Sequence, residues 1–317
     1  MIYSVRHLTK FRYAPTVRES ITEVRMQPRT EGNQRCLSFD LEVKPKAVIL
    51  QYRDFLGNAV HHFDIAASHS ELRIKASSTV EVLPAREPAL AQAESWSDLD
   101  ALVAQGDYWE MLVPSEFASP TRLLEELASE MKLERRANPL AMLREISQGI
   151  HQLFSYVPNS TRVDSPIDHA LGERKGVCQD FAHIMIALVR RLRIPCRYVS
   201  GYLFQAKTDR SLESEGASHA WVEALVPSLG WVGFDPTNDV LAGERHIRVA
   251  IGRDYSEVPP TRGVYKGGAE SELSVSVTVA IADHARLAED LAPMTVLRRT
   301  PGLLASPSIQ EDEQQQQ

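Results

Sequence analysis

The residue with the clearest potential for covalent chemistry is Cys178, in the stretch RKGVCQDFAH at residues 174–183. The chain has three cysteines without CxxC or CxxH spacing, which argues against a disulfide framework or a structural zinc site. Cys178 begins a segment with helical periodicity, and the N–H groups and dipole of a helix N-terminus stabilise a thiolate or an oxyanion. Gly176 would let a substrate approach the backbone closely. The position favours a nucleophile, although a lone helical cysteine is more often a core residue.

A nucleophilic cysteine needs a histidine base, and that histidine needs a partner to orient its ring. Among ten histidines, His219 begins the run HAWVEALV, and Asp235 ends the next run, GWVGFDPT. Both runs have the composition of strands, and the short loop VPSLG joins them. Because adjacent antiparallel strands bring such positions together, the sequence predicts a nucleophile, base and orienting acid in the order Cys178, His219, Asp235.

Two aromatic residues flank these candidates. Tyr156, in FSYVPNST, and Trp221, two residues after His219, are candidates for substrate binding, and each has packing as its alternative. His183 lies five positions after Cys178 on a different helical face, which makes it a poor direct base.

The remaining cysteines and a group of histidines have structural interpretations. Cys36 and Cys196 fit core positions. His61, His62 and His69 match no standard ligand spacing, and neighbouring residues on a strand point to opposite faces. We therefore expect no metal and no cofactor.

The elements that must position the site divide the chain into a strand-rich part and a mixed part. Short runs with period-two alternation fill the first 84 residues and predict an antiparallel β-sandwich or sheet. The stretch PAREPALAQAESWSD then suggests a linker, and we expect residues 238–270 to be rich in loops. Helices are predicted over residues 119–131, 138–154 and 178–194, and strands over 196–204, 219–226, 230–237 and 272–282. Ser119 and Asn138 are the predicted N-caps of the first two helices, each followed by a proline at the first helical position.

The composition and charge of the chain disfavour several classes of protein. A formal net charge of −7 disfavours a nucleic-acid binder, no apolar run reaches about 18 residues, and the N-terminus lacks the apolar core of a signal peptide. We expect a soluble, cytoplasmic protein that does not bind a membrane. The sequence does not determine its oligomeric state.

Four motifs in order carry a resemblance to a known family. The stretches GVCQDFAH, IPCRYVSGYL, SHAWVE and GWVGFDPTN resemble the core of bacterial transglutaminase-like proteins, which are also described as proposed cysteine proteases. HLTKFRYAP, RMQPRT, DFLGN and LRIKASSTVEV are similar to the β-rich domain that precedes this core. The resemblance covers about residues 1–282.

The resemblance implies an α+β protein with a papain-like core and thioester chemistry. It assigns Cys178 as nucleophile, His219 as base and then acid, and Asp235 as the residue that orients the imidazole. We expect a β-rich domain at 1–84, a catalytic domain at 85–285 and a mostly disordered tail at 286–317. The resemblance implies a peptide or protein substrate, and hydrolysis of a peptide or amide bond is favoured. Amine transfer to glutamine and a non-catalytic peptide-binding module remain alternatives.

Overall fold

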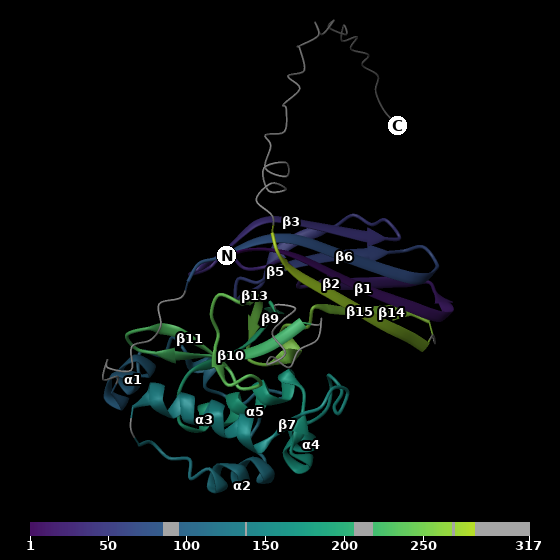
Figure 1. Cartoon of the computed structure of the whole chain (residues 1–317). Coiled ribbons are helices and arrows are strands. Elements are labelled where there is room, and N and C mark those ends of the chain that lie inside the picture. The colour runs from purple at the N-terminus through teal and green to yellow at the C-terminus, as the bar shows by residue number, and fades with distance from the viewer. Residues whose placement is uncertain (85–94, 137, 206–217, 268–269, 283–317) are drawn as a thin grey trace, which may run out of the picture. The chain divides into compact units, whose positions relative to one another are not determined.

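The computed structural model describes residues 1–84, 95–136, 138–205, 218–267 and 270–282 (Figure 1). Most of the predicted linker and the whole predicted tail lie outside these residues. No helix in the described ranges is both long and apolar enough to cross a membrane.

Two four-stranded antiparallel sheets form the strand-rich part, in the orders β15-β1-β6-β3 and β14-β2-β5-β4. One apolar cluster draws residues from both sheets, including Val17 and Ile74 from the first and Val24 and Phe63 from the second. The predicted sandwich therefore forms. Its strands are β1 (Ile2–Val17), β2 (Glu19–Val24), β3 (Gln34–Lys44), β4 (Leu50–Arg53), β5 (Ala59–Ile65), β6 (His69–Val82), β14 (Thr261–Lys266) and β15 (Glu270–Ile281).

The last two strands return to the sheets that the N-terminal region begins. Strand β14 pairs with β2, and β15 pairs along most of β1. The prediction of a loop-rich stretch over 238–270 is wrong, because β12 (Val240–Leu241), β13 (His246–Gly252) and β14 lie within it. The predicted domain boundaries stay a prediction.

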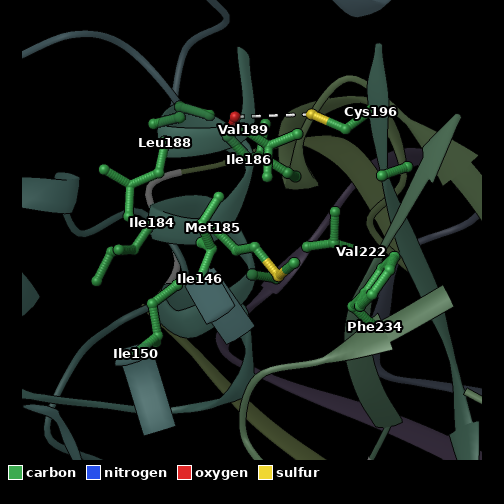
Figure 2. Close-up of a cluster of buried hydrophobic side chains, with 14 of the residues drawn as sticks. Ile146, Ile150, Ile184, Met185, Ile186, Leu188, Val189, Cys196, Val222 and Phe234 are labelled. Atoms are coloured by element: carbon green, nitrogen blue, oxygen red, sulfur yellow. Dashed lines mark hydrogen bonds between the residues drawn. The ribbon is translucent and has the colours of Figure 1, made fainter. Parts of the chain in front are cut away.

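A five-stranded antiparallel sheet forms the second part, in the order β12-β11-β10-β9-β13. Helix α5 packs on β9 and β10 and against α3, and most of its residues are buried (Figure 2). The predicted α+β class is thus confirmed. The remaining strands of the sheet are β9 (Cys196–Leu203), β10 (Ser218–Val226) and β11 (Gly230–Asp235). The helices are α1 (Trp96–Val103), η1 (Trp109–Met111), α2 (Arg122–Glu130), α3 (Pro139–Leu153), α4 (Ile167–Glu173), α5 (Cys178–Arg191) and η2 (Tyr255–Glu257), and the short strands β7 (Ser155–Tyr156) and β8 (Lys175–Gly176) pair in parallel.

Helix caps follow the sequence at α3 and differ at α2. Asn138 caps α3 and accepts from the Ala141 N–H, with Pro139 in the first turn, as predicted. The predicted cap Ser119 instead donates to a backbone carbonyl, and Thr121 caps α2. Thr121 has the extended backbone that an N-cap requires, which moves the start of the helix by two to three residues.

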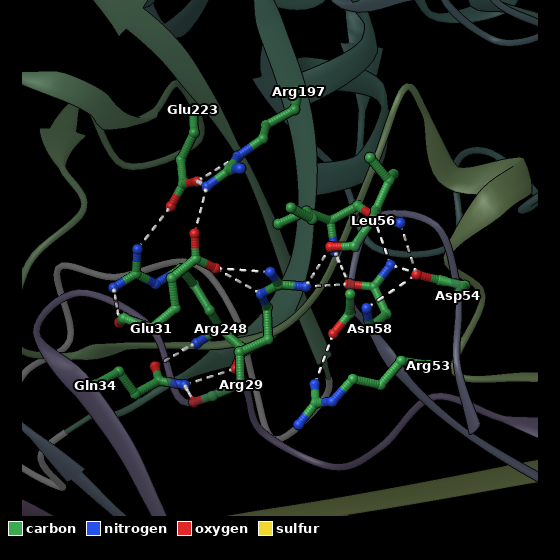
Figure 3. Close-up of polar contacts among 12 residues, drawn as sticks. Arg29, Glu31, Gln34, Arg53, Asp54, Leu56, Asn58, Arg197, Glu223 and Arg248 are labelled. Carbon is green, nitrogen blue, oxygen red and sulfur yellow. Dashed lines mark hydrogen bonds and ion pairs between the residues drawn. The ribbon is translucent and has the colours of Figure 1, made fainter. Parts of the chain in front are cut away.

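Side-chain amides from the sandwich bind the outer edge of β13. Gln34 donates to the carbonyl of Arg248 and accepts from its N–H, each at 2.8 Å (Figure 3). Asn58 makes the equivalent pair with Ile251, at 2.8 and 2.9 Å. Both amides are buried, so they satisfy backbone groups of an edge strand that would otherwise lack partners.

A buried charge network lies beside this edge. Glu223 on β10 contacts the guanidinium of Arg197 at 2.7 Å and that of Arg248 at 3.4 Å (Figure 3). Arg197 also lies 4.3 Å from the centre of the Trp231 ring. Glu31 of the sandwich loop reaches Arg197 at 3.6 Å, so the network joins the sandwich to the sheet that carries the candidate site.

Candidate active site

The start of α5 is built around Asp180. Its carboxylate accepts from the backbone N–H of the N-cap residue Val177 at 2.8 Å and from the Thr161 hydroxyl at 2.5 Å. Burial raises the pKa of this carboxyl, and the hydrogen bonds oppose that effect. A Cβ on Gly176 would lie 2.8 Å from the Asp180 Cβ. The close contact with Asp180 therefore explains why position 176 is a glycine, whereas the sequence suggested close approach of a substrate.

Cys178 is the first residue of α5, and its side chain is partly exposed. The earliest backbone N–H groups of a helix, such as that of Cys178, have no partner within the helix and can donate to an anion. The Asp180 N–H instead donates to the Val177 carbonyl at 2.9 Å. For the other two cysteines, Cys36 and Cys196, burial raises the pKa of the thiol to about 11. Cys196 is wholly buried under α5, which matches its predicted core position (Figure 2).

His219 and Asp235 lie side by side on neighbouring strands. The Nε2 atom of His219 is 2.8 Å from Oδ2 of Asp235, and both side chains are fully buried. Four further donors hold the carboxylate. Oδ1 accepts from the N–H groups of Thr237 and Asn238, and Oδ2 accepts from the Asn238 amide at 2.7 Å and from His246 Nε2 at 3.1 Å.

This environment favours a charged pair. Burial lowers the pKa of His219, but the Asp235 charge and its hydrogen bond outweigh burial and raise that pKa to about 10. Burial raises the pKa of Asp235, but the two histidines hold it well below its usual range. At pH 7 the geometry therefore favours imidazolium at His219 and carboxylate at Asp235.

The other nitrogen of His219 faces a different environment. Nδ1 is buried and has no hydrogen-bond partner among the described residues. The Cys178 side chain is one of the groups that raise the pKa of His219, so the thiol lies within interaction range of the imidazole. The structure thus brings the three sequence-predicted residues together, with Asp235 on one nitrogen of the ring and Cys178 as a neighbour of the same ring.

The two aromatic candidates take different positions. Tyr156 on β7 pairs with Gly176, two residues before Cys178, and is half-buried against the helical core. Trp221 is completely buried, stacks on the His219 ring at 6.2 Å between centroids and meets the His246 ring edge-on at 5.1 Å. These contacts give Trp221 two packing partners, and substrate binding by either aromatic residue stays a prediction.

His183 and the histidines of the sandwich lie apart from this pair. His183 is buried between the rings of Phe117 and Tyr198 and accepts from the Tyr255 N–H, and burial lowers its pKa to about 3. His61 stacks near Phe39 in the sandwich.

Two residues of the site had not been identified from the sequence. His246 lies on β13, in the stretch that was expected to be loop, and Asn238 lies three positions after Asp235. The alternation of HIRVAIG and the amide three positions after Asp235 were the available signals.

The side chains of His219, Asp235 and His246 also have the types and spacing that can hold a metal ion, with ligand atoms within 4.8 Å of one another. Hydrogen bonding accounts for these atoms more fully. His246 Nδ1 accepts from the Gly243 N–H, which leaves the proton of the neutral ring on Nε2, facing Asp235. Oδ2 of Asp235 already receives three donors, and a metal would displace them.

Comparison with known proteins covers most of the chain. Residues 3–81 match the bacterial transglutaminase-like N-terminal region, and residues 126–236 match the transglutaminase-like superfamily. Uncharacterized protein ML0607 of Mycobacterium leprae is 33% identical over 277 residues, which cover 87% of this chain and 97% of that protein. The chain belongs to the transglutaminase-like superfamily.

Other relatives of this transglutaminase-like chain match to different extents. A protein-glutamine gamma-glutamyltransferase of Pseudomonas aeruginosa is 32% identical over 120 residues, which are 36% of this chain and 18% of that protein. A crystal structure of a proposed cysteine protease from Cytophaga hutchinsonii has a TM-score of 0.70 at 22% identity, and covers 89% of this chain and 92% of its own. That likeness supports the fold alone.

Proposed function

We propose that this protein is a cysteine hydrolase or acyltransferase that acts on a peptide or amide bond through a thioester on Cys178. The observation that carries the proposal is the His219–Asp235 pair. One imidazole nitrogen meets a buried carboxylate at 2.8 Å, and the other has no partner among the described residues while Cys178 lies close by. Such a pair keeps a proton on the imidazole and thereby stabilises a neighbouring thiolate.

The first half-reaction forms the thioester. His219 takes the thiol proton of Cys178, and the sulfur attacks the carbonyl carbon, whose electrons move to oxygen. The backbone N–H of Cys178, at the first position of α5, donates to this oxyanion. The intermediate then collapses, the carbon–nitrogen bond breaks, and His219 gives its proton to the leaving amine or ammonia.

The second half-reaction releases the acyl group. His219 takes a proton from the acceptor, which attacks the thioester, and the carbon–sulfur bond breaks. We favour water as the acceptor, so that the product is an acid. Amine transfer is the second candidate, because the relative from Pseudomonas aeruginosa is named as a protein-glutamine gamma-glutamyltransferase.

Alkylation tests whether the site is built for catalysis or is a binding module. Iodoacetamide labelling from pH 5 to 9, mapped by mass spectrometry, follows Cys178 and Cys36 in the same sample. Cys36 is the internal control, because burial raises its pKa to about 11. We expect rapid labelling of Cys178 well below pH 8 and its loss in His219→Ala. Labelling of Cys178 like a free thiol in both proteins contradicts the proposal.

The acceptor is tested separately. A glutamine-containing peptide and casein are incubated with wild type and with Cys178→Ala, in water enriched in ¹⁸O and with dansylcadaverine. Incorporation of ¹⁸O into the acid product supports hydrolysis. Incorporation of the fluorescent amine supports amine transfer and overturns the preference for water.

A further inference from the structure

The contacts around Asp235 extend the site by one residue beyond the three that the sequence predicts. His246 lies on β13, whereas His219 and Asp235 lie on β10 and β11, so three strands contribute to the cluster. Its Nε2 is 3.1 Å from the same carboxylate oxygen that meets His219. The side chain is buried, as are the other two.

The protonation of His246 follows from its second nitrogen. The Gly243 N–H donates to Nδ1 at 3.2 Å, so Nδ1 must carry a lone pair. Nε2 then carries the only ring proton, and the neutral ring donates it to Asp235. Burial also lowers the pKa of His246, with the His219 charge in the same direction, although Asp235 opposes them.

Resting on the proposed function, we propose that His246 is a positioning residue, which holds Oδ2 of Asp235 against Nε2 of His219 from the β13 side. The turn after β11 already holds the carboxylate through the N–H groups of Thr237 and Asn238 and the Asn238 amide. His246 supplies a further contact from β13. The carboxylate is thus fixed between two elements and cannot turn with the loop alone.

The ring of His246 is itself fixed. Trp221 packs against both histidine rings, edge-on to His246 and stacked on His219, and the two histidine rings also contact each other at 6.1 Å between centroids. The edge of β13 is bound through its backbone by buried Gln34 and Asn58 of the sandwich. The charged and titratable groups that act on His246 are Asp235, His219 and the adjacent Arg245.

Substitutions of His246 distinguish two possible effects of its hydrogen bond: alignment of Asp235 with His219, and reduction of the negative charge on Asp235. His246→Leu replaces the hydrogen-bond donor with an apolar side chain, whereas His246→Gln keeps an N–H that can reach Asp235. A charge-assisted hydrogen bond is stronger than a neutral one, so misalignment costs the imidazolium form of His219 more than its neutral form. Positioning therefore predicts that the midpoint of Cys178 alkylation moves to higher pH in the Leu variant. If His246 acted only by reducing the negative charge on Asp235, its loss would move the midpoint to lower pH.

We expect His246→Leu to slow Cys178 alkylation at pH 7 by about tenfold or more, as for loss of a hydrogen bond to a charged group. His246→Gln should keep the wild-type midpoint. His69→Leu is the matched control, since His69 is also a buried, doubly hydrogen-bonded histidine but lies in the sandwich. An unchanged midpoint in the Leu variant, or a lower one, overturns the inference. Absence of rapid wild-type labelling contradicts the proposed function instead.

A second test reads the protonation of His246 in the wild-type protein, and a variant serves only to assign the signal. In ¹⁵N-histidine-labelled protein at pH 7, the ring shifts of His246, assigned from His246→Gln, should show a neutral ring with the proton on Nε2. A charged His246, or a proton on Nδ1, contradicts its role as a neutral donor to Asp235.

Discussion

Removal of the charge on Asp235 tests the electrostatics of the site most directly. Burial lowers the pKa of His219, but the charge and hydrogen bond of Asp235, with a smaller contribution from Cys178, raise that pKa from 6.5 to about 10. This difference between the His219 pKa in the folded protein and its ordinary value corresponds to about 5 kcal/mol, at 1.36 kcal/mol per pKa unit. Asp235→Asn keeps the size of the side chain and removes the charge. Burial then dominates, and we expect the His219 pKa to fall below 6.5.

The expected effect on the thiol can be given as a rate. A free thiol with a pKa near 8.5 is about 3% ionised at pH 7. Without an imidazolium neighbour, Cys178 should react with iodoacetamide like such a free thiol, whereas the proposed pair with His219 should make the wild-type thiol react faster at pH 7. The lower nucleophilicity of a stabilised thiolate offsets part of the difference. We therefore expect Asp235→Asn to slow iodoacetamide labelling at pH 7 by about 10- to 30-fold.

The assay compares labelling rates from pH 5 to 9 in wild type, Asp235→Asn and Asp254→Asn. Asp254 is also a fully buried carboxylate with several donors, but its partners are Phe117 and Ser256 rather than His219. The Asp254 variant should keep the wild-type profile. If Asp235→Asn labels as fast as wild type at pH 6 to 7, the Asp235 charge does not set the state of His219, and the reasoning fails.

The same pair sets a pH dependence of stability. The pKa of His219 is raised in the folded protein, so its contribution is full below pH 6.5 and is lost as pH rises toward 10. The pKa of Asp235 is lowered, so its contribution is present above about pH 4 and is lost as pH falls further. Urea denaturation at pH 5, 7 and 9 should show the largest gap between wild type and Asp235→Asn at pH 5, and a shrinking gap above 6.5.

Two further predictions concern packing and the charge network. Gly176→Ala should cost about 1–3 kcal/mol in urea denaturation and slow Cys178 labelling, because the new Cβ would lie 2.8 Å from that of Asp180. Gly172→Ala is its control, since its nearest neighbour lies at 3.9 Å, and a cost as large there would contradict the packing argument. Glu223→Gln should cost about 3 kcal/mol, because it leaves buried Arg197 without its closest charge partner. A loss below about 0.5 kcal/mol would show that Glu31 and the Trp231 ring compensate.

The sequence predicted the elements whose signals are local. Helix α5 begins at the predicted residue, and β9, β10 and β11 match their predicted runs to within two residues. The neighbourhood of His219 and Asp235 followed from the same logic, since a short loop between two strands leaves antiparallel pairing as the simple arrangement. Helix α4 and strand β2 were not predicted, because each is a short segment of six or seven residues with a weak periodic pattern.

Strand β13 was missed for a different reason. It pairs with β9, with His246 opposite Leu203, so its partner lies more than forty residues earlier in the chain. Its other edge binds side chains rather than a strand, which no local pattern reveals. The sequence could therefore name the residues that adjacent strands bring together, whereas it could not name His246, which reaches the same carboxylate through non-local pairing.

The placement of β13 gives the N-terminal sandwich a defined relation to the site. Residues 34 and 58 hold the outer edge of β13, and the strand in turn carries the histidine that contacts Asp235. The matched N-terminal region, at residues 3–81, supplies both amides. A catalytic sheet cut from this sandwich would leave four backbone groups of β13 without their present partners, at a cost of about 1–3 kcal/mol each if they stayed buried. The geometry of Asp235 therefore depends on a region that contributes none of the three proposed catalytic side chains.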